Sequence, residues 1–151
     1  MYPTGGRAAT VGGVLVLTPD VCEDIVAHAL RGLPHEACGL FAADKGSAGV
    51  HTFFPMANAA ASSEIYRLDG AEMMAVEAKA DEADISIIGV MHSHTHTTAY
   101  PSPTDVADAA TFDPFGAWHY IIVSLKDAVP VLRSYRIVDG QIAEESVAIG
   151  G

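Results

Sequence analysis

Residues 85–91 constrain the fold of this chain more than any other segment. They form an almost unbroken apolar run rich in isoleucine. Such a run is typical of a central β-strand that is buried on both faces. It is far shorter than the roughly 20 apolar residues that cross a bilayer. We therefore expect a fold built around a buried sheet, without a membrane-spanning segment.

Helix patterns lie on both sides of this strand. Thr18 followed by Pro19 is typical of a helix start, because the Thr side chain caps free backbone N–H groups and proline is tolerated at the first helical position. Asp69 with Glu72 forms a second start pattern, that of a capping box. We predict helices over residues 19–32, 71–84 and 103–111, and the inner face of the second contains Met73, Val76, Ala80 and Ala83.

Shorter apolar runs predict the remaining strands. Asp139–Gly140 favours a tight hairpin between the last two strands. Helices that alternate with strands, followed by a strand meander, predict an α/β fold with a mixed β-sheet flanked by helices. The 151 residues suit a single domain at residues 13–149, after a flexible N-terminal arm at residues 1–12. The other predicted strands are residues 13–17, 37–42, 50–55, 65–68, 118–125, 131–138 and 141–147.

The charge balance excludes one broad class of function. Eight Lys and Arg residues stand against nineteen Asp and Glu residues, which gives a net charge of −11. Nucleic-acid affinity depends on basic residues, so we expect no nucleic-acid partner. Two cysteines, Cys22 and Cys38, cannot form a disulfide framework. Residues 1–7 lack the basic start and apolar stretch of a secretion signal, so we expect a cytoplasmic protein.

Candidate metal ligands follow directly after the buried strand. On an extended backbone, residues i and i+2 point to the same side, so His92 and His94 can aim their imidazoles at one point while Ser93 faces away. Asp105, in the first turn of the next helix, is the candidate third ligand. Two imidazoles, one carboxylate and a water form a catalytic zinc shell with an open position. His96 extends the alternation and could replace Asp105, but we favour a position for it outside the ligand set, either around the metal ligands or exposed to solvent.

Each part of this segment also has a purely structural interpretation. A His-x-His pair is common in surface strands, and Ser102 to Asp105 is an ordinary helix start. The parts gain meaning together with Glu36, because an early Glu followed by His-x-His, seven residues, Ser, two residues and Asp resembles the signature of the JAMM (MPN-plus) metallopeptidase family.

The resemblance extends over about residues 14–147. Residues 36–40 resemble the bacterial branch of the family. Four further stretches resemble the actinobacterial CysO-cysteine hydrolases more closely still, namely residues 66–69, 92–94, 99–102 and 133–140. The resemblance implies the JAMM/MPN fold, whose layout is similar to that of cytidine deaminases.

The same resemblance implies a role for each matching residue. His92, His94 and Asp105 would hold one Zn²⁺ per chain. Glu36 would act first as general base and then as general acid, and Ser102 would donate a hydrogen bond to the oxyanion. The substrate would be the C-terminal Gly-Gly region of a small ubiquitin-like (β-grasp) sulfur carrier, from which the enzyme would release cysteine.

The substrate tail is expected to enter a narrow channel, where only glycine lets the backbone pass close to the metal. It would dock as an added strand, and the candidate contacts are Tyr66, Arg67, Thr97 and Tyr100. A general JAMM processing peptidase for carriers in cofactor or natural-product sulfur transfer is the nearest alternative, and a non-enzymatic MPN scaffold is a second. The sequence leaves the oligomeric state open, a dimer included. Its own Gly150–Gly151 end is expected to resemble a carrier tail by chance.

Overall fold

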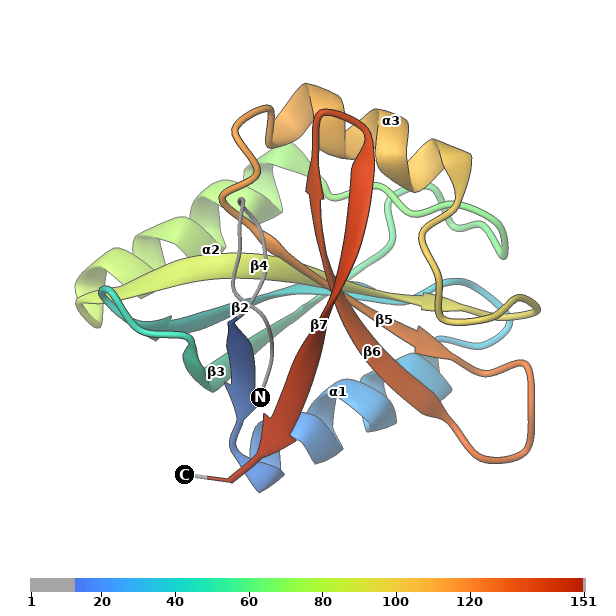
Figure 1. Ribbon diagram of the computed structural model, residues 1–151, viewed down its shortest axis with the longest axis horizontal. Coiled ribbons are helices and arrows are strands. Elements are labelled where there is room, and N and C mark those ends of the chain that lie inside the picture. The colour runs from blue at the N-terminus through green and yellow to red at the C-terminus, as the bar shows by residue number, and fades with distance from the viewer. Residues whose placement is uncertain (1–12, 151) are drawn as a thin grey trace.

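Residues 13–150 are described by the computed structural model, and they form seven strands and three helices (Figure 1). The predicted arm at residues 1–12, and Gly151, lie outside these described residues. The elements in chain order are β1 (Val14–Leu17), α1 (Pro19–Gly32), β2 (Cys38–Asp44), β3 (Gly49–Met56), α2 (Gly70–Glu82), β4 (Ile85–His94), α3 (Pro103–Phe112), β5 (His119–Ser124), β6 (Val131–Val138) and β7 (Gln141–Ile149).

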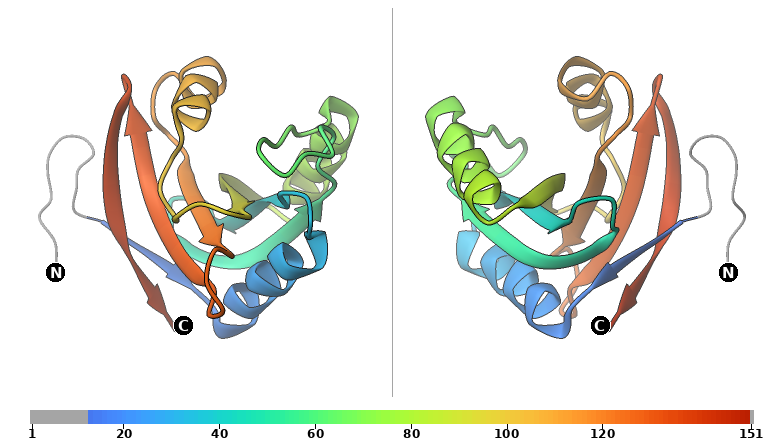
Figure 2. Two further views of the ribbon diagram at one scale, coloured as in Figure 1. Left: turned by 90° about the vertical axis from the view of Figure 1, so that its right-hand side faces the viewer. Right: turned by 90° about the vertical axis from the view of Figure 1, so that its left-hand side faces the viewer.

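The strands form one closed sheet in the order β1–β3–β2–β4–β5–β6–β7. β1 closes the sheet by pairing in parallel with both β3 and β7. β4 and β5 are also parallel, and the other pairs are antiparallel. The curved sheet has α1 on one side and α2 and α3 on the other (Figures 1 and 2). This confirms the predicted mixed sheet flanked by helices, whereas its closure was not predicted.

β4 lies at the centre of the fold between β2 and β5. Its side chains alternate between two apolar clusters, as expected for a strand buried on both faces. Met91 belongs to the cluster that contains Ile25 of α1. Val90 belongs to the cluster that contains Val76 of α2 and Ala109 of α3. The strand continues to His94, three residues beyond its predicted end.

The helix starts confirm the capping patterns. The Thr18 hydroxyl accepts a hydrogen bond from the N–H of Val21 at 3.3 Å, and α1 has the predicted bounds. The Asp69 carboxylate accepts one from the N–H of Glu72 at 2.9 Å. The second half of that predicted capping box is wrong, because the Glu72 carboxylate accepts instead from the N–H of Ala57 at 3.3 Å.

Two further predictions are wrong. Ala83 is exposed rather than on the inner face of α2, because α2 ends at Glu82, the residue before it. Residues 65–68 form no strand. Their backbone groups are bonded by the loop that precedes them, including the side chain of Asn58, which leaves this segment outside the main sheet.

The turn between β6 and β7 is the predicted hairpin. Asp139 and Gly140 both have positive φ, of 52° and 74°, as a tight turn of this kind requires. Within residues 13–150, no helix is long and apolar enough to cross a membrane.

Candidate metal centre and active site

His92 and His94 lie at the end of β4 and point to the same side of the sheet. They share the alternation of Val90, which places them on the side of α2 and α3. Their Nε2 atoms are 3.1 Å apart. Ser93 faces the other way, where its hydroxyl accepts a hydrogen bond from the N–H of Ala37 at 2.8 Å. This confirms the orientation predicted for the three residues.

Asp105 reaches the two imidazoles from the first turn of α3. Its Oδ2 atom lies 3.2 Å from Nε2 of His92 and 3.1 Å from Nε2 of His94. The same oxygen accepts a hydrogen bond from the N–H of Ser102 at 2.9 Å, and the Ser102 hydroxyl accepts one from the N–H of Asp105 at 3.1 Å. This capping box starts the helix and also aims the carboxylate at the histidines.

The three donor atoms have the spacing of ligands around one metal ion. In a tetrahedral zinc site with bonds of about 2.0–2.1 Å, neighbouring ligand atoms are about 3.3 Å apart. The observed separations are 3.1 to 3.2 Å. His92, His94 and Asp105 together form a candidate metal-binding group, and His96, which is exposed, is not part of it. Two imidazoles and a carboxylate fit a divalent cation with one position left for water.

The surroundings of His94 prepare its Nε2 atom for a metal, whereas those of His92 fix only the position of its ring. His94 donates from Nδ1 to the carbonyl of Thr98 at 2.8 Å, which leaves the lone pair on Nε2. Nδ1 of His92 is buried and has no hydrogen-bond partner among the described residues. The His92 ring is held instead by Tyr66, which stacks on it with ring centroids 4.4 Å apart.

Glu36 is buried just before β2, at the same end of the sheet as His92. Cys38, two residues later, pairs with His92 across the strands. Glu36 is only 5% exposed to solvent. Burial raises the pKa of its carboxyl from an ordinary 4.5 to about 7; the nearby His94 opposes this rise, and the charge of Asp105 adds to it. A carboxyl with this pKa can exchange protons near neutral pH.

Asp105 has the opposite electrostatic state. Burial alone would raise the pKa of Asp105, but the hydrogen bonds with His92 and His94 hold it well below its ordinary value. The site therefore contains one carboxylate that stays ionised and one carboxyl that titrates near neutrality. This division suits a metal ligand beside a proton carrier.

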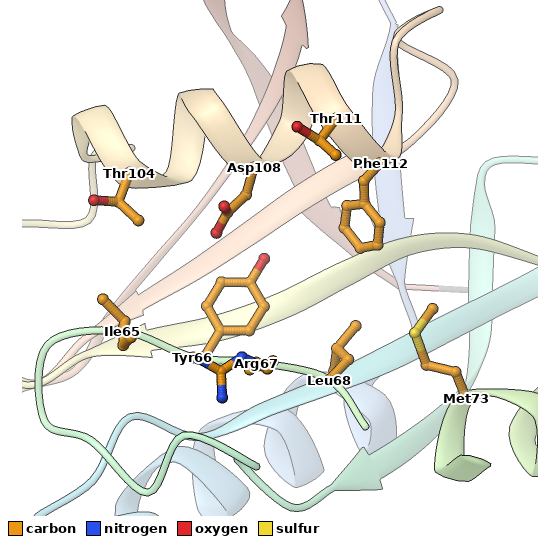
Figure 3. A pocket seen from close by; sticks show the side chains of 9 residues that line it. All are labelled: Ile65, Tyr66, Arg67, Leu68, Met73, Thr104, Asp108, Thr111 and Phe112. Atoms are coloured by element: carbon orange, nitrogen blue, oxygen red, sulfur yellow. The ribbon is translucent and has the colours of Figure 1, made fainter. Parts of the chain in front are cut away.

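A pocket of about 340 Å³ adjoins the site, between the segment 65–68 and α3 (Figure 3). Tyr66 connects the two, because its ring stacks on His92 while its hydroxyl end points toward Asp108. Arg67 and Thr104 also line the pocket, and its other end is apolar. The residues at the apolar end are Leu68, Met73 and Phe112, and Ile65 lies at the opposite end of the pocket (Figure 3).

The two remaining predicted contact residues lie on the loop between His94 and Ser102. Thr97 and Tyr100 are both exposed. The carbonyl of Thr97 accepts a hydrogen bond from the Ser124 hydroxyl at 2.6 Å, and the Tyr100 ring packs edge-on against Tyr135. Neither lines the pocket beside Tyr66. Their contact with a substrate stays a prediction.

Sequence reasoning missed one residue of the site, Asn58. Its side chain bonds to the backbone of Glu36, Ile65 and Arg67 and so connects the buried acid with the pocket wall. Nothing in its sequence context, a short alanine-rich stretch, indicates this role. Only the three-dimensional arrangement shows it.

Comparison with known proteins places this site in a family. The model of Prok-JAB, described as prokaryotic homologs of the JAB domain, matches residues 18–138. The chain belongs to this family. The membership confirms the resemblance that the Glu and His-x-His signature predicted.

Two curated relatives of this Prok-JAB chain are named as peptidases. It is 44% identical over 137 residues to the CysO-cysteine peptidase of Mycobacterium tuberculosis H37Rv, which covers 90% of this chain and 91% of that protein. It is 30% identical over 116 residues to a probable TtuB-protein conjugate cleaving protease of Thermus thermophilus, over 74% of this chain and 76% of that one.

Solved structures share the fold. A Desulfitobacterium hafniense protein with a known solution structure superposes with a TM-score of 0.81 at 31% identity, over 91% of this chain and 92% of that one. A JAB1/MPN domain protein of Archaeoglobus fulgidus superposes with a TM-score of 0.58 at 16% identity, over 91% of this chain and 100% of that one. The latter shows the shared fold alone.

Proposed function

We propose that this chain is a zinc-dependent peptidase that cuts after the C-terminal Gly-Gly of a ubiquitin-like sulfur carrier and releases cysteine. One observation carries the proposal: His92, His94 and Asp105 converge within 3.2 Å of one another beside the buried, readily protonated Glu36. Three ligands with an open position distinguish a catalytic zinc site from a structural one.

The chain's own residues account for the proton transfers. When bound, zinc would supply Lewis-acid chemistry, by lowering the pKa of a bound water and polarising the scissile carbonyl. Glu36, in its carboxylate form, takes a proton from the attacking water and returns it to the departing amine. The Ser102 hydroxyl accepts from Asp105 N–H, and its own hydrogen is bonded to none of the described residues, so it is available to the developing oxyanion.

The relatives support the choice of substrate. One is named for CysO-cysteine and the other for conjugates of TtuB, so both names describe cleavage of an adduct on a carrier. The higher identity, 44% over 90% of this chain, favours cysteine as the residue released. A general processing peptidase that removes longer extensions from carriers is the second candidate, favoured by the Thermus relative.

The pocket wall beside the metal ligands is where the carrier tail would lie. Tyr66 and Arg67 line the pocket, and the Tyr66 ring stacks on His92, which supports their predicted role as substrate contacts. Thr97 and Tyr100 are exposed on the loop that joins the ligands, so they are available to the released residue or to the carrier surface.

Intact-mass measurement tests the function. Carriers ending in Gly-Gly-Cys and in Gly-Gly followed by a peptide are incubated with zinc-loaded protein, with and without a chelator. We expect the first to lose the mass of one cysteine residue, and only without chelator. Preferred cleavage of the peptide extension would support the general processing enzyme instead. Protein that retains no zinc after loading and cleaves neither carrier would favour a non-enzymatic scaffold.

A further inference from the structure

Asn58 makes an unusual number of side-chain hydrogen bonds for a loop residue. Its Nδ2 donates to the carbonyls of Glu36 at 3.0 Å and Ile65 at 2.9 Å, with a longer contact of 3.4 Å to Ser62. Its Oδ1 accepts from the N–H groups of Ala60 at 2.9 Å and Arg67 at 3.0 Å. The amide therefore uses both of its ends on the backbone around it.

The bonds to Ile65 and Arg67 have the pattern of a β-ladder. In a parallel ladder, one residue of the neighbouring strand bonds the carbonyl of one residue and the N–H of the residue two places later. The Asn58 amide makes that pair of bonds around Tyr66. The two bonded groups thus face one edge of the segment, and the N–H and carbonyl of Tyr66 face the opposite edge.

The opposite edge is open in the described part of the chain. The backbone N–H and carbonyl of Tyr66 have no hydrogen-bond partner among residues 13–150. The Tyr66 ring stacks on His92 with centroids 4.4 Å apart, so the residue that carries this open edge also contacts a metal ligand through its side chain. An extended peptide that paired with the edge would therefore bind a residue that borders the metal centre.

We infer that Asn58 is a positioning residue, whose side-chain amide replaces a neighbouring strand and so presents the backbone edge of Tyr66 to an extended Gly-Gly tail. The inference rests on the proposed function, since it assigns that tail to this edge. The Asn58 side chain also donates to the Glu36 carbonyl, and the Glu36 N–H donates to the Ser62 carbonyl at 2.8 Å. These two bonds fix the position of this edge relative to the buried acid.

A binding experiment without turnover tests the inference. The zinc-loaded protein is titrated with the peptide acetyl-Ala-Ala-Ala-Gly-Gly while the backbone amide signals are followed by NMR. We expect the Tyr66 amide to shift with the peptide, and Asn58→Ala to weaken binding at least fivefold with unchanged zinc content. Asn58→Asp, which keeps the acceptor for Arg67 N–H but cannot donate to Ile65, should bind with intermediate affinity.

Ser62→Ala is the matched control on the same loop. It removes the hydroxyl that accepts from Glu64 and Ile65 N–H but leaves the Asn58 bonds around Tyr66 in place, so peptide affinity should stay within twofold of the wild type. If Asn58→Ala does not fold, the Asn58→Asp titration decides alone.

The outcomes separate this inference from the proposed function. An unmoved Tyr66 amide in the wild type, or Asn58 variants that bind the peptide as the wild type does, would overturn the role of Asn58 while carrier cleavage could still be observed. A wild type that binds the peptide at Tyr66 in an Asn58-dependent way, but cleaves no carrier, would refute the proposed function and leave the inference standing.

Discussion

Replacement of Glu36 by Gln should raise the stability of the metal-free protein at alkaline pH while it removes activity. The native carboxyl has a pKa of about 7 in place of an ordinary 4.5, because it is buried. The native state therefore binds this proton more tightly than the unfolded chain does, and it loses stability as the pH rises from about 4.5 to about 7. At about 1.36 kcal/mol for each tenfold difference in proton affinity, the loss is on the order of 3 kcal/mol.

Urea unfolding of the zinc-free protein at pH 5 and pH 8 measures this effect. Glu36→Gln has no such ionisation, so its free energy of unfolding should exceed that of the wild type by about 2.5 kcal/mol more at pH 8 than at pH 5. Its kcat should fall by roughly 10²–10⁴ because the proton carrier is gone. Glu77→Gln on the exposed face of α2 is the control and should change neither quantity.

The reasoning would be refuted by a stability difference between the Glu36→Gln protein and the wild type that does not depend on pH. It would equally be refuted by retained activity in that variant. The first result would mean that Glu36 is not held protonated by burial, and the second that it carries no proton in the reaction.

Three further predictions concern the same centre. The kcat/KM of the zinc-loaded wild type should rise with pH as Glu36 ionises, at a pH below the value of about 7 that the carboxyl has without zinc, because the bound cation favours the carboxylate; a kcat/KM that falls as the pH rises from 5 to 7 would exclude Glu36 as the base. Asp105→Asn can still accept from Ser102 N–H but loses its charge, so a chelator-buffered titration should show zinc affinity at least ~10-fold weaker, and unaltered affinity would remove Asp105 from the ligand set. The metal-free variant should also melt at a lower temperature at neutral pH, because a carboxylate whose pKa is held well below its ordinary value stabilises the native state. Ser102→Ala should lower kcat by about 10²–10³ and destabilise α3 by about 1 kcal/mol, whereas Ser102→Thr should keep the helix cap. Equal kcat in the alanine variant and the wild type would argue against an oxyanion role.

The parts of the fold that local chemistry determines could be predicted from the sequence. Thr18, Asp69 and Ser102 each start a helix through a bond to a backbone N–H within three residues, so the signal is local and easily read. The two-residue period of β4 likewise places His92 and His94 on one face wherever the strand lies in the sheet.

The convergence of Asp105 on the histidines could be predicted for a related reason. The capping box fixes this carboxylate at the start of α3, and a short loop joins that start to the end of β4. Glu36 was predicted from the family signature alone. It lies far from the histidines in the sequence, so no local pattern indicates that it is part of the site.

Other features depend on contacts between distant segments and left no local pattern. Closure of the sheet needs β1 to pair with both β3 and β7, and no periodicity within β1 specifies either partner. Residues 65–68 have the composition of a strand, but the side chain of Asn58 takes the bonds that a neighbouring strand would make. The predicted strand was wrong because a side chain, rather than a backbone, is its partner.

The metal content and ligand set of the purified protein test the central claim most directly. X-ray absorption at the zinc edge, together with the zinc-to-protein ratio, reports both. We predict one zinc per chain, bound by two imidazole nitrogens and by oxygen at about 2.0–2.2 Å, and its loss in His94→Ala. A zinc ion bound through sulfur at about 2.3 Å, or full hydrolytic activity in protein that holds no metal, would contradict the account.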